Sequence, residues 1–90
     1  MNDIRTMAMN NRKLAEYCSK NSLKRKVTAS KGRYVIIGKN GEMGVISCMP
    51  SNNGKYQAYK AGTHTEEYFD SHVACPAFYS FEMALEHITR

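Results

Sequence analysis

The alternation of apolar and polar positions along the 90-residue chain predicts a helix towards each end, with strands between them. The first helix is expected to begin at Asn10 or Asn11, which are good N-cap residues, and to end near Asn21. Its apolar positions have the i, i+3, i+4 spacing of an amphipathic helix: Leu14, Tyr17 and Cys18. Residues 1–9 carry no clean apolar stripe, so we expect them to form a flexible arm.

The last helix is predicted to start after Ser80, a favourable N-cap residue. Glu82 in its first turn complements the helix dipole. Its apolar positions follow the spacing i, i+3, i+4, i+7: Phe81, Ala84, Leu85 and Ile88. The pattern therefore indicates a short helix with one buried face.

A β-hairpin around Asn40-Gly41 is the clearest feature between the helices. Two β-rich runs, 33–39 and 42–49, flank this pair, and Asn-Gly favours a two-residue turn because both turn residues adopt positive φ. Such a turn fixes the register of the two strands. It predicts three cross-strand pairs: Ile36 with Val45, Ile37 with Gly44, and Val35 with Ile46.

A third strand is expected over residues 55–61, and residues 62–76 form a polar, acidic connection. A further short strand around Val27 and Thr28 is also considered. The chain is thus predicted to be one small α+β domain over residues 1–90. It would have a three-stranded antiparallel sheet and the element order α-β-β-β-α.

In the predicted register, both faces of the sheet are apolar. One face would contain Val35, Ile37, Ile46, Cys48, Tyr56 and Ala58. The other would contain Tyr34, Ile36, Met43, Val45 and Tyr59. Two short helices cover only one of them, so the second face is either covered within the chain or is a contact surface for a partner or a second copy.

Charge is distributed unevenly along the chain, whose net charge is +5. Residues 1–60 hold twelve Lys and Arg against three acids, whereas residues 61–90 hold one Arg against five acids. A solvated charged face, an attraction between the two halves, or a docking surface would each explain this asymmetry. The basic residues expected to attract a partner are Lys24, Arg25, Lys26, Lys31 and Arg33.

Composition bears on the cellular compartment. The chain opens without the apolar segment of a secretory signal, and its longest aliphatic run is residues 35–37, so neither secretion nor a membrane span is expected. Three widely spaced cysteines are a poor disulfide framework and fit a reducing compartment. We therefore expect the cytoplasm of a bacterium or of an infected host.

Metal and cysteine chemistry have weak support in the sequence. His64, His72 and Cys75 share one connection, but no Cys-x-x-Cys pair accompanies them, whereas a structural zinc site usually has paired short spacings. Acidic neighbours of Cys75 disfavour a reactive thiolate. We predict no metal, no cofactor and no catalytic residue, and whether these three side chains come together is left open.

A small basic ribonuclease is the enzyme alternative. The segment Gly62-Thr63-His64 is similar to the Gly-Ser-His element that holds the catalytic histidine of HicA-type toxins, and the predicted element order resembles their double-stranded-RNA-binding fold. The resemblance implies RNA cleavage with His64 as the catalytic residue.

The leading functional hypothesis is a non-enzymatic binding protein that occupies or inhibits a macromolecular partner. Tyr and Met are enriched at interface cores, and the chain is rich in both. By analogy of size and composition, phage and mobile-element accessory proteins act in this way on host nucleic-acid-handling or defence enzymes. Direct nucleic-acid binding by the basic residues and the sheet tyrosines is the alternative.

Overall fold

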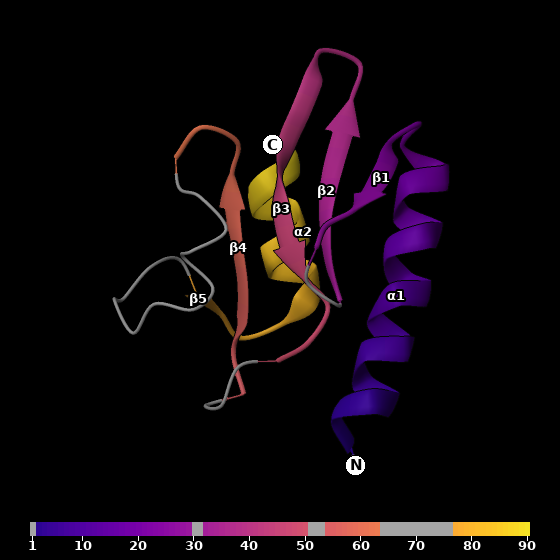
Figure 1. Cartoon of the computed structure of the whole chain (residues 1–90), viewed down its shortest axis with the longest axis vertical. Helices are drawn as coiled ribbons and strands as arrows, with labels where there is room; N and C mark the ends of the chain where they lie inside the picture. Colours follow the sequence, from indigo (N-terminus) through magenta and orange to yellow (C-terminus); the bar gives the residue numbers. More distant parts are fainter. Residues whose placement is uncertain (1, 30–31, 51–53, 64–76) are drawn as a thin grey trace.

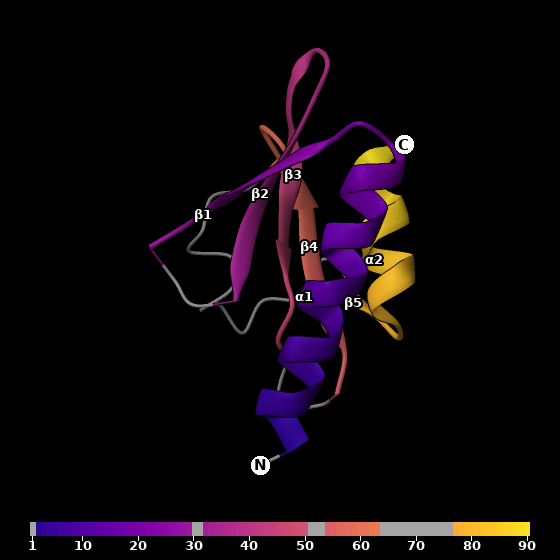
Figure 2. The same ribbon diagram turned by 90° about the vertical axis from the view of Figure 1, so that its right-hand side faces the viewer.

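Two helices pack on one face of an antiparallel sheet in the computed structural model, as the edge-on view in Figure 2 shows. The structure describes residues 2–29, 32–50, 54–63 and 77–90. The helices are α1 (Asn2–Lys20) and α2 (Phe81–Thr89). The strands are β1 (Lys24–Val27), β2 (Arg33–Gly38), β3 (Gly41–Ser47), β4 (Tyr56–Lys60) and β5 (Ala77–Phe78).

The sheet is a meander in which each strand pairs with the next one along the chain, in the order β1-β2-β3-β4-β5 (Figure 1). The α+β architecture with a helix at each end is therefore as predicted. The sheet has five strands rather than three. The two additional strands carry weak signals, because β1 is three basic residues and one valine and β5 has only two residues.

The predicted register of the β2–β3 hairpin is wrong by one or two residues. The observed pairs include Val35 with Val45, Ile36 with Gly44, and Ile37 with Glu42. Gly38 pairs with Gly41, so the turn lies at Lys39 and Asn40, and only Gly41 in this segment has a positive φ, 115°. This pattern fits a turn followed by a glycine bulge rather than the predicted turn, in which both residues need positive φ.

A second irregularity follows the turn, because the register shifts between Ile36 and Ile37 and leaves Met43 without a direct partner. A one-residue slip moves side chains to the other face of a sheet. The two irregularities therefore redistribute the residues that the sequence analysis had assigned to each face.

The main core lies between the sheet and the helices. Its buried members are Leu14 and Cys18 of α1, Ile36, Ile46, Cys48 and Ala58 of the sheet region, and Phe81, Ala84, Leu85 and Ile88 of α2. Tyr34 and Met43 pack against this core. A separate small cluster of Val45, Tyr59 and Val35 lies on the other face, since side chains alternate along a strand.

Helix α1 begins at Asn2, so residues 2–9, which were expected to form an arm before the helix, belong to the helix itself. The buried stripe of this helix runs through Met7, Asn10 and Leu14, with Asn10 only 3% exposed. Asn10 does not cap the helix. Its Nδ2 donates a hydrogen bond of 2.9 Å to the Cys48 carbonyl oxygen and so ties α1 to the end of β3.

Helix α2 forms as predicted. The Ser80 side chain accepts a hydrogen bond from the Met83 backbone nitrogen at 3.2 Å. The four predicted apolar residues are all buried. Gly44 allows the helix to lie close to the sheet, because a Cβ atom there would lie 2.9 Å from the Ile88 Cβ and 2.5 Å from the Tyr59 carbonyl oxygen.

Two side-chain contacts join the helices to each other. Lys13 Nζ lies 2.8 Å from Glu82 Oε2, and the Tyr17 hydroxyl lies 2.9 Å from Thr89 Oγ1. The second contact closes the layer near the C-terminal end of both helices. The helices thus cover one face of the sheet as a connected layer.

Candidate binding surface

Strand β1 forms one edge of the sheet, and all four of its residues are exposed. Lys24 pairs with Ile37 and Lys26 pairs with Val35, so both lysines project on the face of the sheet that lacks helices. Neither lysine has an ion-pair partner among the described residues. Val27, at the end of the strand, is 72% exposed.

Arg25, by contrast, is engaged within the chain. Its guanidinium lies 5.1 Å from the centre of the Tyr34 ring. Its Nη1 donates to the carbonyl oxygen of Asn11 at 3.3 Å and to Asn11 Oδ1 at 3.2 Å. Arg25 therefore fastens β1 to α1, and its charge is partly satisfied there.

The other two predicted basic residues differ in accessibility. Arg33 is half-buried on β2, where it pairs with Ser47 and makes further interactions. Lys31 lies outside the described residues. The predicted electrostatic set is thus divided, and Lys24 and Lys26 are its freely exposed members.

The outer face of α1 adds residues that the sequence analysis missed. Arg5 and Arg12 are exposed, and Ile4 and Met9 are 67% and 56% exposed. Arg5, Met9 and Arg12 lie opposite the buried stripe of α1, and Ile4 lies at the flank of that stripe, as helical spacing requires. The signal was present as a continuation of the helical period before residue 10, but it was assigned to an arm.

We call this region the α1–β1 surface: Ile4, Arg5, Met9 and Arg12 of α1 with Lys24, Lys26 and Val27 of β1. The two elements lie side by side at one edge of the molecule (Figure 1), and the hydrogen bonds of Arg25 to Asn11 join them. Glu16 is exposed on α1 as well. The surface therefore combines four exposed cations and one exposed acid with apolar side chains, and its lysines and arginines lie on opposite sides of the sheet.

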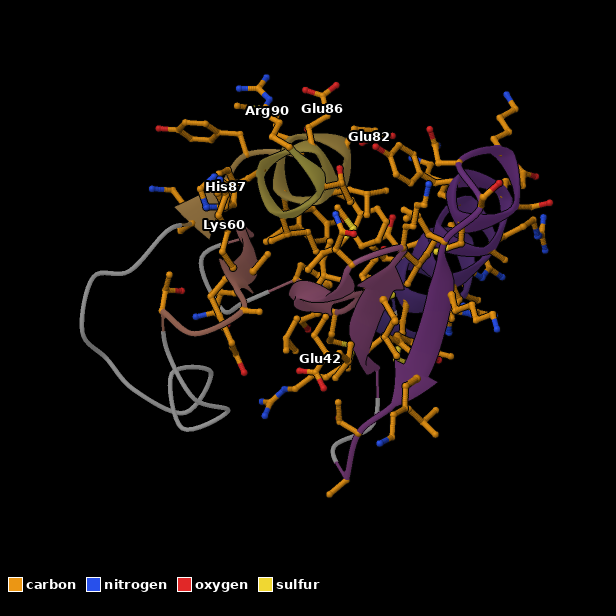
Figure 3. The ribbon with its side chains drawn as sticks, turned by 90° about the horizontal axis from the view of Figure 1, so that it is seen from above. Glu42, Lys60, Glu82, Glu86, His87 and Arg90 are labelled. Carbon is orange, nitrogen blue, oxygen red and sulfur yellow. The ribbon has the colours of Figure 1, made fainter. Side chains whose placement is uncertain are left out.

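Apart from Asp3 and Glu16 of α1, the acidic residues in the described part of the chain lie on β3 and α2. Viewed from above, Glu82 and Glu86 lie on α2, and Glu42 lies on the far side of the sheet (Figure 3). The Lys13 ammonium lowers the pKa of Glu82 mainly through its hydrogen bond, and Glu82 in turn raises the pKa of Lys13. This pair neutralises Lys13, so the positive charge of α1 that is available to a partner lies on Arg5, Arg12 and Lys20.

The predicted apolar docking residues do not share one exposed face. Tyr34, Ile36 and Met43 pack under the helices, and Ile36 has no exposed surface. Val45 and Tyr59 lie on the other face, 7% and 5% exposed. A partner or a second copy would need these five side chains to be exposed on one face. The shifted register instead divides them between the two faces of the sheet.

The thiols of the described residues are structural. Cys18 and Cys48 are both free and buried. Burial raises the pKa of Cys18, and it raises the pKa of Cys48 to about 12, although the charge of Arg25 opposes both shifts. Both cysteines are therefore unreactive thiols of the core.

No cluster of three or more potential metal-ligating side chains occurs in the part of the chain that the structure describes. The residues named for metal, thiol and ribonuclease chemistry, His64, His72 and Cys75, lie outside that part. The acidic connection lies outside it as well from residue 64 to residue 76.

Comparison of the chain with protein-family models, with curated proteins and with solved structures finds no match. Within the described ranges, neither helix combines the length and the apolar character that crossing a membrane requires.

Proposed function

We propose that the chain is a non-enzymatic binding protein that occupies an acidic surface of a protein partner through its α1–β1 surface. The observation that carries the proposal is the exposure of Arg5, Arg12, Lys24 and Lys26 without an ion-pair partner among the described residues. Cations that are solvated in the free protein attract an acidic surface and steer its approach. The partner class predicted from the sequence, a host nucleic-acid-handling or defence enzyme, stays a prediction.

The composition of the α1–β1 surface favours a protein over a nucleic acid. Met and Arg are enriched at protein interfaces, and Ile4 and Met9 supply apolar area that phosphate contacts do not use. The tyrosines predicted to stack on bases are engaged in contacts within the chain. Tyr34 lies beneath the Arg25 guanidinium, and Tyr59 is buried.

The test is a fluorescence anisotropy titration of the full chain with labelled polyglutamate, duplex DNA, duplex RNA and single strands, between roughly 50 and 200 mM salt. The double variant Arg5→Glu/Arg12→Glu should weaken polyglutamate binding about tenfold. Lys39→Glu/Lys60→Glu is the matched control, because both lysines are exposed outside the α1–β1 surface and the charge change is identical. Micromolar binding of a nucleic acid at the higher salt, without binding of polyglutamate, would overturn the proposal.

Direct nucleic-acid binding is the second candidate, and one observation favours it. Tyr79 is 78% exposed, and Lys55 Nζ lies 5.0 Å from the centre of its ring. An exposed ring beside a cation suits base stacking next to a phosphate contact. Under this alternative, Tyr79→Ala should weaken single-strand binding about tenfold, whereas it should leave polyglutamate binding unchanged.

A further inference from the structure

We propose that the free edge of β1 binds an extended acidic peptide segment of the partner as an additional strand of the sheet. The inference deepens the proposed function and rests on it. It names the part of the α1–β1 surface that recognises main chain, and the conformation in which the partner segment binds. Addition of a strand to an exposed sheet edge is a general mode of peptide recognition.

Alternate residues of β1 form backbone hydrogen bonds with β2, so the backbone groups of the two residues between them point to the open edge of the sheet. The Thr28 amide donates to the Arg33 carbonyl oxygen at 3.3 Å, in the same register that pairs Lys26 with Val35. In an antiparallel ladder, alternate residues direct their N–H and C=O groups to the neighbouring strand. Thr28, Lys26 and Lys24 therefore face β2, and Arg25 and Val27 direct theirs to the open edge.

These outward groups are unpaired within the part of the chain that is described. Arg25 and Val27 each have one N–H and one C=O at the edge, and neither residue has a further hydrogen bond that would satisfy them. The edge therefore presents backbone N–H donors and C=O acceptors at every second residue, which is the spacing of a strand. A peptide strand satisfies both kinds of group, whereas a phosphate backbone supplies only acceptors.

The side chains of β1 specify the chemistry of the added strand. Lys24 and Lys26 project on one face, and the exposed Val27 projects on the other. A strand with acidic residues at alternate positions and apolar residues between them would place its acids beside the lysines and an apolar group beside Val27. The expected segment therefore alternates Glu or Asp with β-branched residues.

A second copy of the chain is a poor occupant of this edge. Pairing of β1 with another β1 would bring Lys24, Arg25 and Lys26 against the same three residues, and like charges on neighbouring strands are destabilising. Lysines on edge strands also protect proteins from self-association. The charge that disfavours a second copy favours an acidic segment.

The experiment follows amide hydrogen exchange in the ¹⁵N-labelled full chain with a blocked peptide, acetyl-Thr-Glu-Val-Glu-Val-Thr-amide. Exchange at the Arg25 and Val27 amides should slow at least about tenfold at saturation, because these amides gain acceptors. The matched peptide is acetyl-Thr-Glu-Glu-Val-Val-Thr-amide, which has the same composition but puts its acids on opposite faces. Its affinity should be about tenfold weaker.

Protein variants provide the second measurement. Lys24→Glu/Lys26→Glu should weaken binding of the alternating peptide about tenfold, and the control Lys39→Glu/Lys60→Glu should retain it. In a series of peptides that each carry one N-methylated amide, binding should be lost when the methylated amide faces β1 and retained when the next amide along the peptide is methylated instead. This parity is specific to a hydrogen-bonded strand, because a purely electrostatic complex would be insensitive to it.

The failures of the two proposals are distinguishable. If the alternating peptide binds but leaves the Arg25 and Val27 amides unprotected, the edge proposal is wrong while the proposed function stands. If neither this peptide nor polyglutamate binds, both are wrong. If the peptide fails to bind and Lys24→Glu/Lys26→Glu makes the chain self-associate, the two lysines serve only to prevent pairing of β1 with another chain, and the inference is overturned.

Discussion

Replacement of Asn10 by alanine should destabilise the fold, although Asn10 lies within a helix in which alanine is the better helix former. Asn10 is almost fully buried, and its amide nitrogen donates to the carbonyl oxygen of Cys48, 38 residues along the chain. The substitution removes this donor and leaves the Cys48 carbonyl oxygen without it. It also leaves a small void between α1 and the end of β3.

The magnitude follows from two opposing effects. Loss of one partner from a buried hydrogen bond costs about 1–3 kcal/mol. The better helix propensity of alanine returns about 0.5 kcal/mol. The free energy of unfolding of Asn10→Ala should therefore fall by about 0.5–2.5 kcal/mol, which corresponds to a decrease in Tm of roughly 2–20 °C for a domain of this size.

Urea unfolding followed by far-ultraviolet circular dichroism measures this change, with Ser19→Ala on the exposed side of α1 as the control. The control should unfold within about 0.5 kcal/mol of the parent chain. Asn10→Asp should be more destabilising at neutral pH than Asn10→Ala, because a buried carboxylate has no hydrogen to donate. Acid should relieve part of this defect by protonating the carboxyl group. An Asn10→Ala variant as stable as the control would refute the assignment of Asn10 as a buried anchor of α1.

Three further predictions follow from other contacts. The Lys13–Glu82 pair is exposed and should contribute at most about 1 kcal/mol at pH 7. This contribution should disappear as the pH falls through the lowered pKa of Glu82, because the carboxylate is then protonated, and as the pH rises through the raised pKa of Lys13, because the ammonium then loses its proton. A double-mutant cycle at acid, neutral and alkaline pH measures the contribution. Gly44→Ala should lower the free energy of unfolding by about 1–3 kcal/mol, because the added Cβ would meet the Tyr59 carbonyl oxygen of β4 and the Ile88 side chain of α2. An unchanged urea midpoint would contradict this close packing. Cys48, whose pKa is raised by burial to about 12, should resist iodoacetamide in the native chain and react in urea; peptide mass spectrometry distinguishes it from the other thiols.

The β2–β3 hairpin shows that the presence of two strands can be predicted from the sequence, whereas their register cannot. Its two strands were predictable because β-rich runs flank Asn40-Gly41. Its register was not, because Asn40 does not share the positive φ of Gly41 and because Met43 is an extra residue in its strand. Each irregularity changes the pairing at little cost in local energy, and no local pattern marks either one.

Helix α1 was predicted too short for a different reason. Its buried stripe contains a polar residue, Asn10, at a core position, and asparagine next to a second asparagine resembles a helix start. The partner that makes burial of this side chain favourable is the Cys48 carbonyl oxygen, which is distant in sequence. Met7, about one turn before Asn10, could therefore be assigned to the buried stripe of the helix only once this distant partner of Asn10 was known.

The candidate binding surface was partly predictable. Lys24 and Lys26 belong to the basic segment that the charge distribution singles out, and both are exposed on β1. Arg25 has the same sequence signal but contacts Asn11 and the Tyr34 ring. Composition along the chain does not reveal which of three adjacent cations turns inward, because strand parity and the position of α1 decide it.

The strand order has a consequence for how the chain acquires its structure. Every strand of the sheet pairs with its immediate neighbour along the chain, and the connections between β1, β2, β3 and β4 are short, so this part of the sheet has low contact order. The helical layer is different, because the Tyr17 hydroxyl meets Thr89, 72 positions later. During synthesis α1 emerges first, yet it gains this contact only after Thr89 has left the ribosome. The helical layer is therefore completed last, although α1 can already contact the strands through Asn10 and through Arg25 of β1.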